Sequence, residues 1–349
     1  MPVKKQKTVK FNQILDALKD LSRPFPPSYL HHFSDLSNES TQLLRQGWGS
    51  VQVERRRALL SDLEELSDAD TLVSFLEVGR LALEDEDAQV RSLGIRLLWE
   101  AEDISLIPIL IGMMENDADA NVRATAANGL GAYIYLGEIE SLSQSLLETI
   151  EESLLKVTAS KDQSIVRQRA LESLGFSSRR EVPDLIEQAY QSGTPEWIES
   201  ALFAMGRSAD ARWGSIVLKE LDNANPEIQH EAIRAAGELQ LASARQRLLD
   251  MLEETEDDVT LTALAWSLSQ IGGDGVRAAL ENLVDEVEDD ELGDIFEEAL
   301  DNLSFTEDMA IFDLFDLDVG GDPDSFVDLD QLDDSEDGDG DSTRPGKEH

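Results

Sequence analysis

The sequence of 349 residues contains no cysteine and only four histidines. Without cysteine the chain cannot form disulfides, thiolate nucleophiles or cysteine-ligated zinc sites, which fits a reducing compartment. Its longest apolar stretch, residues 104–114, is too short to cross a bilayer. The first ten residues are basic but lack the apolar segment and cleavage site of a signal peptide. These absences predict a cytoplasmic protein.

Positive charge is also scarce, because 29 Lys and Arg stand against 73 Asp and Glu, a formal net charge of −44. Such a field repels phosphate backbones and anionic lipids, so we expect neither nucleic acid nor membrane as a partner. The acidity is concentrated at one end, where residues 281–341 contain 26 acidic residues and no Lys or Arg. The charge therefore predicts a protein partner with a basic or mixed-charge surface.

A repeated phrase runs along most of the chain, in which an apolar residue is followed four positions later by a small one. The anchor residues, spaced by 32, 44, 31, 31, 32 and 32 residues, are Val90, Val122, Val166, Trp197, Ile228, Thr260 and Leu292. Periods of this length are typical of solenoids, whose helical units bury apolar faces against their neighbours and leave a long surface exposed. The phrase predicts an all-α fold of stacked helical hairpins.

Start signals mark the first helix of each hairpin. Residues typical of helix N-caps stand three positions before most anchors: Asp87, Asp119, Thr194, Asn225, Asp257 and Asp289. Only the Val166 repeat departs, with Gln163, and the flanking Asp162 or Ser164 could serve there. We expect second helices over residues 105–114, 181–190, 211–221, 242–252 and 275–287. The long interval should lengthen a helix or its loop between residues 132 and 161.

Three parts of the chain follow from these patterns. Residues 1–83 are predicted to form a helical N-terminal cap that covers the open face of the first repeat, and residues 84–304 the repeat array. Residues 305–349 are rich in Asp, Gly and Ser and are predicted to form a disordered acidic tail. Within the tail, Ile311, Phe312 and Phe315 are candidate partner-binding residues.

The repeat phrases resemble HEAT repeats. The resemblance is carried by residues 119–124 with Gly129-Leu130-Gly131, and by Val166-Arg167 with Ser173-Leu174-Gly175. It covers about residues 84–304 and implies an α-solenoid of about seven HEAT-like hairpins of the phycobilisome-lyase type. The Arg that follows the anchor is replaced by Ile198 and Gln229, which makes a continuous Asp–Arg ladder between repeats doubtful.

Two enzyme groups share this resemblance, the bilin lyases and deoxyhypusine hydroxylase, in which repeated His-Glu pairs hold two irons. The array contains one such pair, His230-Glu231, whereas iron needs several converging ligands. We therefore predict no catalytic, cofactor-binding or metal-binding residue, and no cofactor. The tryptophans of the array, Trp99, Trp197, Trp213 and Trp266, are expected in the core. The run Arg55-Arg56-Arg57 is expected on a solvated helix face.

The sequence predicts a non-catalytic scaffold or adaptor that binds a protein through the solenoid surface, with charge steering by the acidic tail. One alternative is an enzyme or enzyme subunit of the HEAT-like class, similar to a bilin lyase or a deoxyhypusine hydroxylase-like oxidoreductase. A second alternative is an acidic chaperone, in which the tail and not the solenoid surface binds basic proteins. A related hypothesis has the tail fold back on Arg55–Arg57 and mask the groove.

Overall fold

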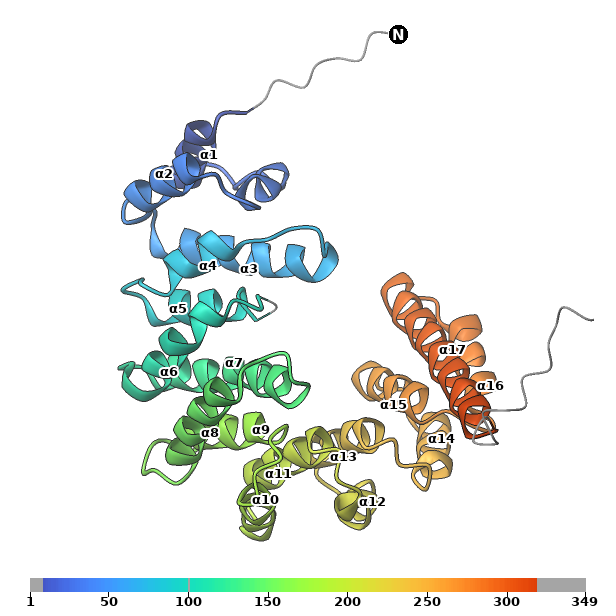
Figure 1. Ribbon diagram of the computed structural model, residues 1–349. Helices are drawn as coiled ribbons and strands as arrows, with labels where there is room; N and C mark the ends of the chain where they lie inside the picture. The colour runs from blue at the N-terminus through green and yellow to red at the C-terminus, as the bar shows by residue number, and fades with distance from the viewer. Residues whose placement is uncertain (1–8, 100, 319–349) are drawn as a thin grey trace, which may run out of the picture.

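The computed structural model describes residues 9–99 and 101–318, and their side chains up to residue 306. In this part of the chain the regular structure is helical throughout, without strands. The helices stack into a curved array whose two ends bend toward each other (Figure 1). The expected all-α solenoid is therefore confirmed.

The N-terminal helices pack around a core of their own. They are α1 Phe11–Lys19, η1 Pro27–Phe33, α2 Asn38–Trp48, α3 Val53–Ala69 and α4 Leu76–Ala82. Phe33, Leu44 and Leu60 are fully buried in this core, which also takes in Val90 and Leu93 of the next helix, α5 Ala88–Arg96. The N-terminal helices thus cover the apolar face of the first repeat, as a solenoid end requires.

The regular repeats form two layers. One layer holds the helices that begin with the anchor phrase: α5, α7 Ala120–Glu138, α9 Ser164–Leu174, α11 Pro195–Arg207, α13 Pro226–Glu238, α15 Asp258–Ile271 and α17 Asp290–Asp318. From α7 to α17 this layer follows the inner curve of the array (Figure 1). We call it the inner layer.

The second helices of the hairpins form the other layer. They are η2 Ile104–Leu106 with α6 Ile107–Asn116, α8 Gln144–Thr158, α10 Val182–Gln191, η3 Ala211–Trp213 with α12 Gly214–Glu220, α14 Arg245–Glu254 and α16 Val276–Glu286. Each expected second helix is present within a few residues of its predicted bounds. The long interval is taken up by two long helices, α7 with 19 residues and α8 with 15. Leu147, Ile150 and Leu154 of α8 are buried.

Most of the predicted caps are present. Asp87 accepts a hydrogen bond from the Val90 backbone N–H, Asp119 from Asn121, and Asp257 from Thr260. Asn225 and Asp289 make equivalent bonds. Thr194 is the N-cap of α11 as expected, but its side chain makes no cap bond. The expectation that Asp162 or Ser164 caps α9 is wrong, because the cap residue there is Gln163. Asp162 faces Arg123 of the preceding repeat instead.

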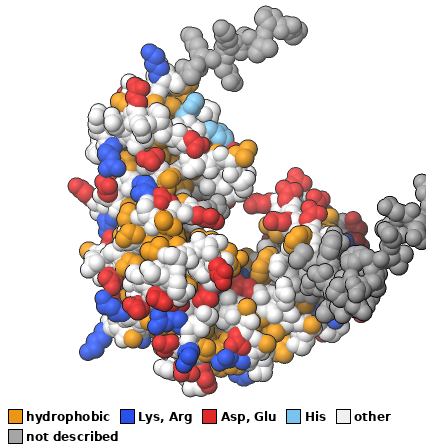
Figure 2. Space-filling model, viewed as in Figure 1, with side chains coloured by type: hydrophobic (Ala, Val, Ile, Leu, Met, Phe, Trp, Pro, Cys, Tyr) orange, Lys and Arg blue, Asp and Glu red, His pale blue; other side chains and the backbone are white. Residues whose placement is uncertain are grey.

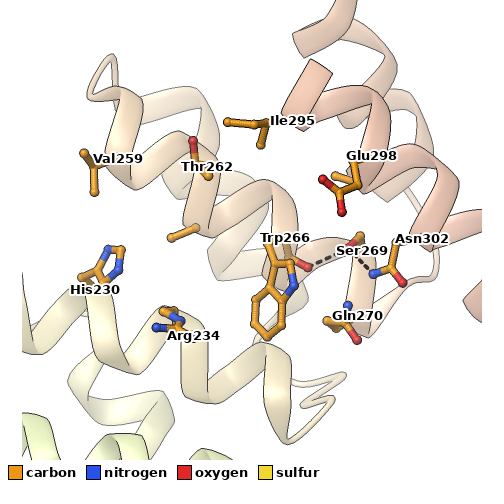
Figure 3. A pocket seen from close by; sticks show the side chains of 12 residues that line it. His230, Arg234, Val259, Thr262, Trp266, Ser269, Gln270, Ile295, Glu298 and Asn302 are labelled. Atoms are coloured by element: carbon orange, nitrogen blue, oxygen red, sulfur yellow. Dashed lines mark hydrogen bonds between the residues drawn. The ribbon is translucent and has the colours of Figure 1, made fainter. Parts of the chain in front are cut away.

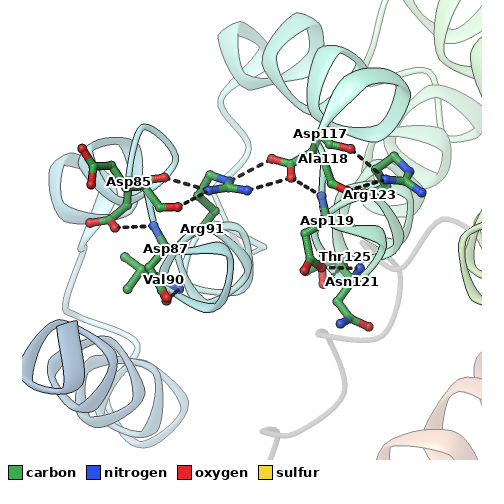
Figure 4. A network of polar contacts seen from close by, with 11 residues as sticks. Asp85, Asp87, Val90, Arg91, Asp117, Ala118, Asp119, Asn121, Arg123 and Thr125 are labelled. Carbon is green, nitrogen blue, oxygen red and sulfur yellow. Dashed lines mark hydrogen bonds and ion pairs between the residues drawn. The ribbon is translucent and has the colours of Figure 1, made fainter.

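An Asp–Arg ladder joins the first repeats (Figure 4). Arg91 donates from Nε and Nη2 to both carboxylate oxygens of Asp117 at 2.8 and 2.7 Å, and Nη1 reaches the Asp85 carbonyl at 2.9 Å. Arg123 binds Asp162 in the same bidentate way at 2.8 and 2.6 Å. Bidentate pairs of this kind fix the register between neighbouring repeats.

The ladder stops in the middle of the array. In the described part of the chain Arg167 has no carboxylate partner; it donates to the Thr158 carbonyl at 3.0 Å, and its guanidinium carbon lies 5.2 Å from the centre of the Trp197 ring. Gln229, one repeat after Ile198, donates to the Leu221 carbonyl at 2.8 Å. The doubt about a continuous ladder is confirmed, since Arg167 and Gln229 each reach a carbonyl without an ion pair and Ile198 has no side-chain donor.

The arginine run on α3 is not a solvated face, contrary to expectation. Arg56 pairs at 2.8 Å with Asp85, whose side chain is fully buried, and Arg57 pairs with Asp87 at 2.5 Å. Arg55 donates to the Asp20 and Arg23 carbonyls. Arg56 and Arg57 therefore pair with acidic residues that precede α5, and Arg55 with two carbonyls, so this run does not offer a free site for the tail.

The array's last helix continues past residue 304, to Asp318 of α17. Ile311, Phe312 and Phe315 lie on this helix, but their side chains are beyond the described ones. Residues 319–349, the larger part of the predicted acidic tail, lie outside the described part of the chain. No helix in the part that is described has the length and hydropathy needed to span a membrane.

Candidate functional site

The candidate site lies on the inner layer, where side chains of successive helices meet. In the space-filling view the molecule is hollowed along its inner curve, and acidic side chains gather on the arm where α17 begins (Figure 2). One cavity opens on the inner layer over α9–α13, and another over α13–α17. We call them the Glu231 cavity and the Trp266 cavity.

The Glu231 cavity has a volume of about 530 Å³, and five of the twelve residues that line it are glutamates. They are Glu172, Glu196, Glu199, Glu227 and Glu231, and Arg169 is the one cation among the described residues that line it. The indole of Trp99, 41 % exposed, and the ring of Phe203 also line the cavity. The cavity is therefore negatively charged with aromatic walls.

Glu231 is the unusual member of this group. Its Oε2 is buried and has no hydrogen-bond partner in the described part of the chain. Burial, together with the negative charges of Glu172, Glu238 and Glu199, raises the pKa of Glu231 to about 7, although Arg234 opposes the shift. By contrast, Glu172 accepts hydrogen bonds from Ser200 at 2.7 Å and from Arg169 at 2.5 Å. A carboxylate left without a donor at this depth carries a free-energy cost that a cation could relieve.

The Trp266 cavity, of about 640 Å³, is more apolar (Figure 3). Val259 and Trp266 from α15 and Ile295 from α17 line it, with His230 and Arg234 of α13 along one side. Across the α15–α17 junction, Asn302 donates to Ser269 at 2.8 Å. Val259 is 65 % exposed, so an apolar side chain from outside would find contacts here.

An aromatic–arginine row connects the two cavities across the inner layer. In order along the array it consists of Tyr135, Phe176, Arg207, Phe203, Arg234 and Trp266. The guanidinium carbon of Arg207 lies 4.6 Å from the Phe176 ring centre and 4.1 Å from that of Phe203. The guanidinium carbon of Arg234 lies 5.8 Å from Phe203 and 5.9 Å from Trp266. The Arg207–Phe203 pair lies within α11, whereas the other three pairs join neighbouring repeats and hold their side chains in place.

Burial changes the titration of the charged groups beside the row. It lowers the pKa of Arg207 and raises the pKa of Glu238. His230 is half-buried, and burial together with the positive charge of Arg234 lowers its pKa. Among the described residues, no three His, Cys, Asp or Glu side chains are grouped so that they could hold a metal ion.

The tryptophans divide between the core and the site. Trp213 is buried, as expected, and Trp197 is half-buried under Arg167. Trp99 and Trp266 line the two cavities, so the expectation that they are core residues is wrong. Trp266 lies on the face of α15 that lines its cavity, and Trp99 lies in the turn that follows α5.

Most of the site was missed in the sequence, although a signal for it exists. The position six residues after each anchor contributes to the inner layer throughout the array, and it holds Arg96, Asn128, Glu172, Phe203, Arg234, Trp266 and Glu298. Asn128, Glu172 and Phe203 line the Glu231 cavity. Arg234, Trp266 and Glu298 line the Trp266 cavity. A register count from the anchors would have indicated this face.

The sequence profile of HEAT repeats matches residues 78–154 and 215–301. The fold and these matches together define the class: the chain is a HEAT-repeat α-solenoid. No curated protein matches the sequence significantly.

Several solved structures are similar to the chain. The CpcE–CpcF complex of phycocyanin lyase from Nostoc is 14% identical over 87% of this chain and 98% of that chain, with a TM-score of 0.49. Human deoxyhypusine hydroxylase is 17% identical over 84% and 96%, with a TM-score of 0.34. YibA of Escherichia coli is 17% identical over 86% and 99%, with a TM-score of 0.38. At these values the neighbours say nothing of what this chain binds or catalyses.

Proposed function

We propose that this protein is a non-catalytic scaffold whose inner layer binds a segment of a protein partner that carries positively charged side chains. The observation that carries the proposal is the buried Oε2 of Glu231, which has no hydrogen-bond donor among the described residues and lies in a cavity lined by four further glutamates. Extended concave surfaces of helical-repeat proteins are built for contacts of this kind.

A Lys or Arg side chain in the Glu231 cavity would supply the missing donor. Its charge would favour the ionised carboxylate and bring the pKa of Glu231 down from about 7. Trp99 and Phe203 would contact the aliphatic stem of the cation or stack on a guanidinium. The adjoining Trp266 cavity would take an apolar neighbour in the same segment. The fitting partner therefore has a basic residue close to an apolar one.

The acidic C-terminal residues would act on the rate of association. Residues 281–341 carry 26 acidic side chains without a cation, and such a field attracts a basic partner over about one Debye length. Removal of residues 319–349 should slow association at low salt and have little effect at high salt. An association rate that is the same with and without these residues at low salt would contradict the steering role.

A photo-crosslinking residue in place of Phe203 in cells, followed by mass spectrometry, would identify the partner segment. Its affinity is then measured for the wild type, for Glu231→Gln and for the control Glu152→Gln, an exposed residue of α8. We expect Glu231→Gln to weaken binding by about tenfold, because a charge-assisted bond becomes a neutral one, and the control to change it less than twofold. Equal affinities for all three proteins would refute the proposal.

The enzyme alternative has a test of its own. A purified protein with a bilin absorption band or with stoichiometric iron would contradict the non-catalytic proposal. A fragment of residues 281–349 that binds the partner as tightly as the full chain would instead favour the acidic chaperone.

A further inference from the structure

A groove lies between α14 and α16, in the layer formed by the second helices of the hairpins. It has a volume of about 770 Å³ and shares no lining residue with the two cavities of the inner layer. Its floor is apolar and is made of half-buried side chains: Leu249, Leu252, Leu261, Leu283, Val287 and Leu292. We call it the α14–α16 groove.

The rim of the groove carries charge of one sign. Glu253, Glu256, Asp258 and Glu286 stand along it and are all exposed. No Lys or Arg is present among the described residues that line the groove. An apolar floor between acidic edges is complementary to a segment that is apolar on one face and basic on its flanks.

We propose that the α14–α16 groove binds an amphipathic basic helix of a protein partner. The helix lays its apolar face on the leucines, and its Lys or Arg side chains meet the four rim carboxylates, a recurring mode of helix-in-groove recognition. The ten residues of α14 and eleven of α16 give the groove a length of about 15 Å at 1.5 Å per residue. A partner helix of about three turns spans this length.

The sequence of this chain does not supply the occupant. Residues 319–349 carry 11 acidic and two basic side chains, so the rim repels them. Residues 1–8 carry three lysines, but beside Pro2 their only apolar side chains are Met1 and Val3, too few to cover six apolar residues. The charge and the apolar floor together therefore indicate a different protein.

The proposal is tested on the full chain with a labelled helical peptide of about 14 residues, made of Leu on one face and Lys elsewhere. Fluorescence anisotropy gives its Kd. The rim variant Glu253→Gln/Glu256→Gln should weaken binding by about tenfold, and the matched control Glu152→Gln/Glu187→Gln, which removes the same charge from α8 and α10, by less than twofold. Equal losses in both variants would overturn the proposal.

Two further measurements separate the groove from general attraction to a polyacid. A peptide of the same composition without an apolar face should bind at least about tenfold more weakly, and equal binding would overturn the proposal. A benzophenone on the apolar face should crosslink to Leu252 or Leu283, and crosslinks to the inner layer alone would refute the assignment. Glu231→Gln should leave the crosslinks to Leu252 and Leu283 unchanged, so this proposal and that for the inner layer fail independently.

Discussion

Replacement of Glu231 by Gln should stabilise the protein at pH 8 and have little effect at pH 4.5. The pKa of Glu231 is raised from its ordinary 4.5 to about 7, first by burial and then by neighbouring carboxylates. A folded-state pKa above the unfolded value means that the folded protein holds its proton more tightly. Stability is therefore lost as the pH rises from about 4.5 through about 7, and the loss is complete above that window.

The magnitude follows from the shift. A difference of about 2.5 pKa units corresponds to about 3 kcal/mol at 1.36 kcal/mol per unit, as an upper bound because some solvent reaches the side chain. Glutamine keeps the shape of the side chain and cannot ionise, so the variant escapes this cost. It should therefore be more stable than the wild type by up to about 3 kcal/mol at pH 8.

The assay compares urea unfolding of the wild type and the variant at pH 4.5, 6 and 8, followed by circular dichroism. Because a repeat array can unfold in parts, hydrogen exchange of the α13 amides gives the local value. The exposed Glu152→Gln is the control and should show no pH-dependent difference. A Glu231→Gln variant that is equally or less stable than the wild type at pH 8 would refute the reasoning about the unpartnered carboxylate.

Two further predictions concern the packing of the array. Arg91→Ala removes the bidentate partner of the mostly buried Asp117 and should lower the free energy of unfolding by about 3 kcal/mol. Arg45→Ala breaks an exposed pair with Glu84 and should lower it by less than about 1 kcal/mol in the same urea denaturation assay. A Cβ at Gly237 would stand 2.8 Å from the Cα of Ser267, so Gly237→Ala should lower the melting temperature; Gly112→Ala, with nothing within 4 Å, should raise it. Equal effects within either pair would contradict the packing argument.

The fold was predictable because its signals are local. A cap residue, an anchor three positions later and a small residue four positions after that are all read within one helix, and they recur with the period of the hairpin. Gly94 shows why the small residue is needed, since an added Cβ would stand 2.7 Å from the Cβ of Ala82 on the neighbouring helix. The resemblance to HEAT repeats depended on the same local phrases.

The arginines show where local signals end. Arg56 and Arg57 have the sequence pattern of a solvated run, but the acidic residues that pair with them are about 30 residues away. Whether a charge lies in solvent or against a partner depends on which helix is stacked beside it. The same holds for Asp162, which the sequence offers as a possible cap of α9 but which instead accepts a hydrogen bond from Arg123 of the preceding repeat.

The sequence alone determined the all-α class, the helical period and most helix starts, because each depends on residues a few positions apart. Only the tertiary structure decided that Oε2 of Glu231 has no donor among the described residues, that Arg207 stacks on Phe176 and Arg234 on Trp266 of neighbouring repeats, and that the leucines of α14 and α16 form one groove. These features join side chains that are about one repeat apart in sequence. Their contacts are set by how neighbouring repeats stack, which no single phrase of the sequence encodes.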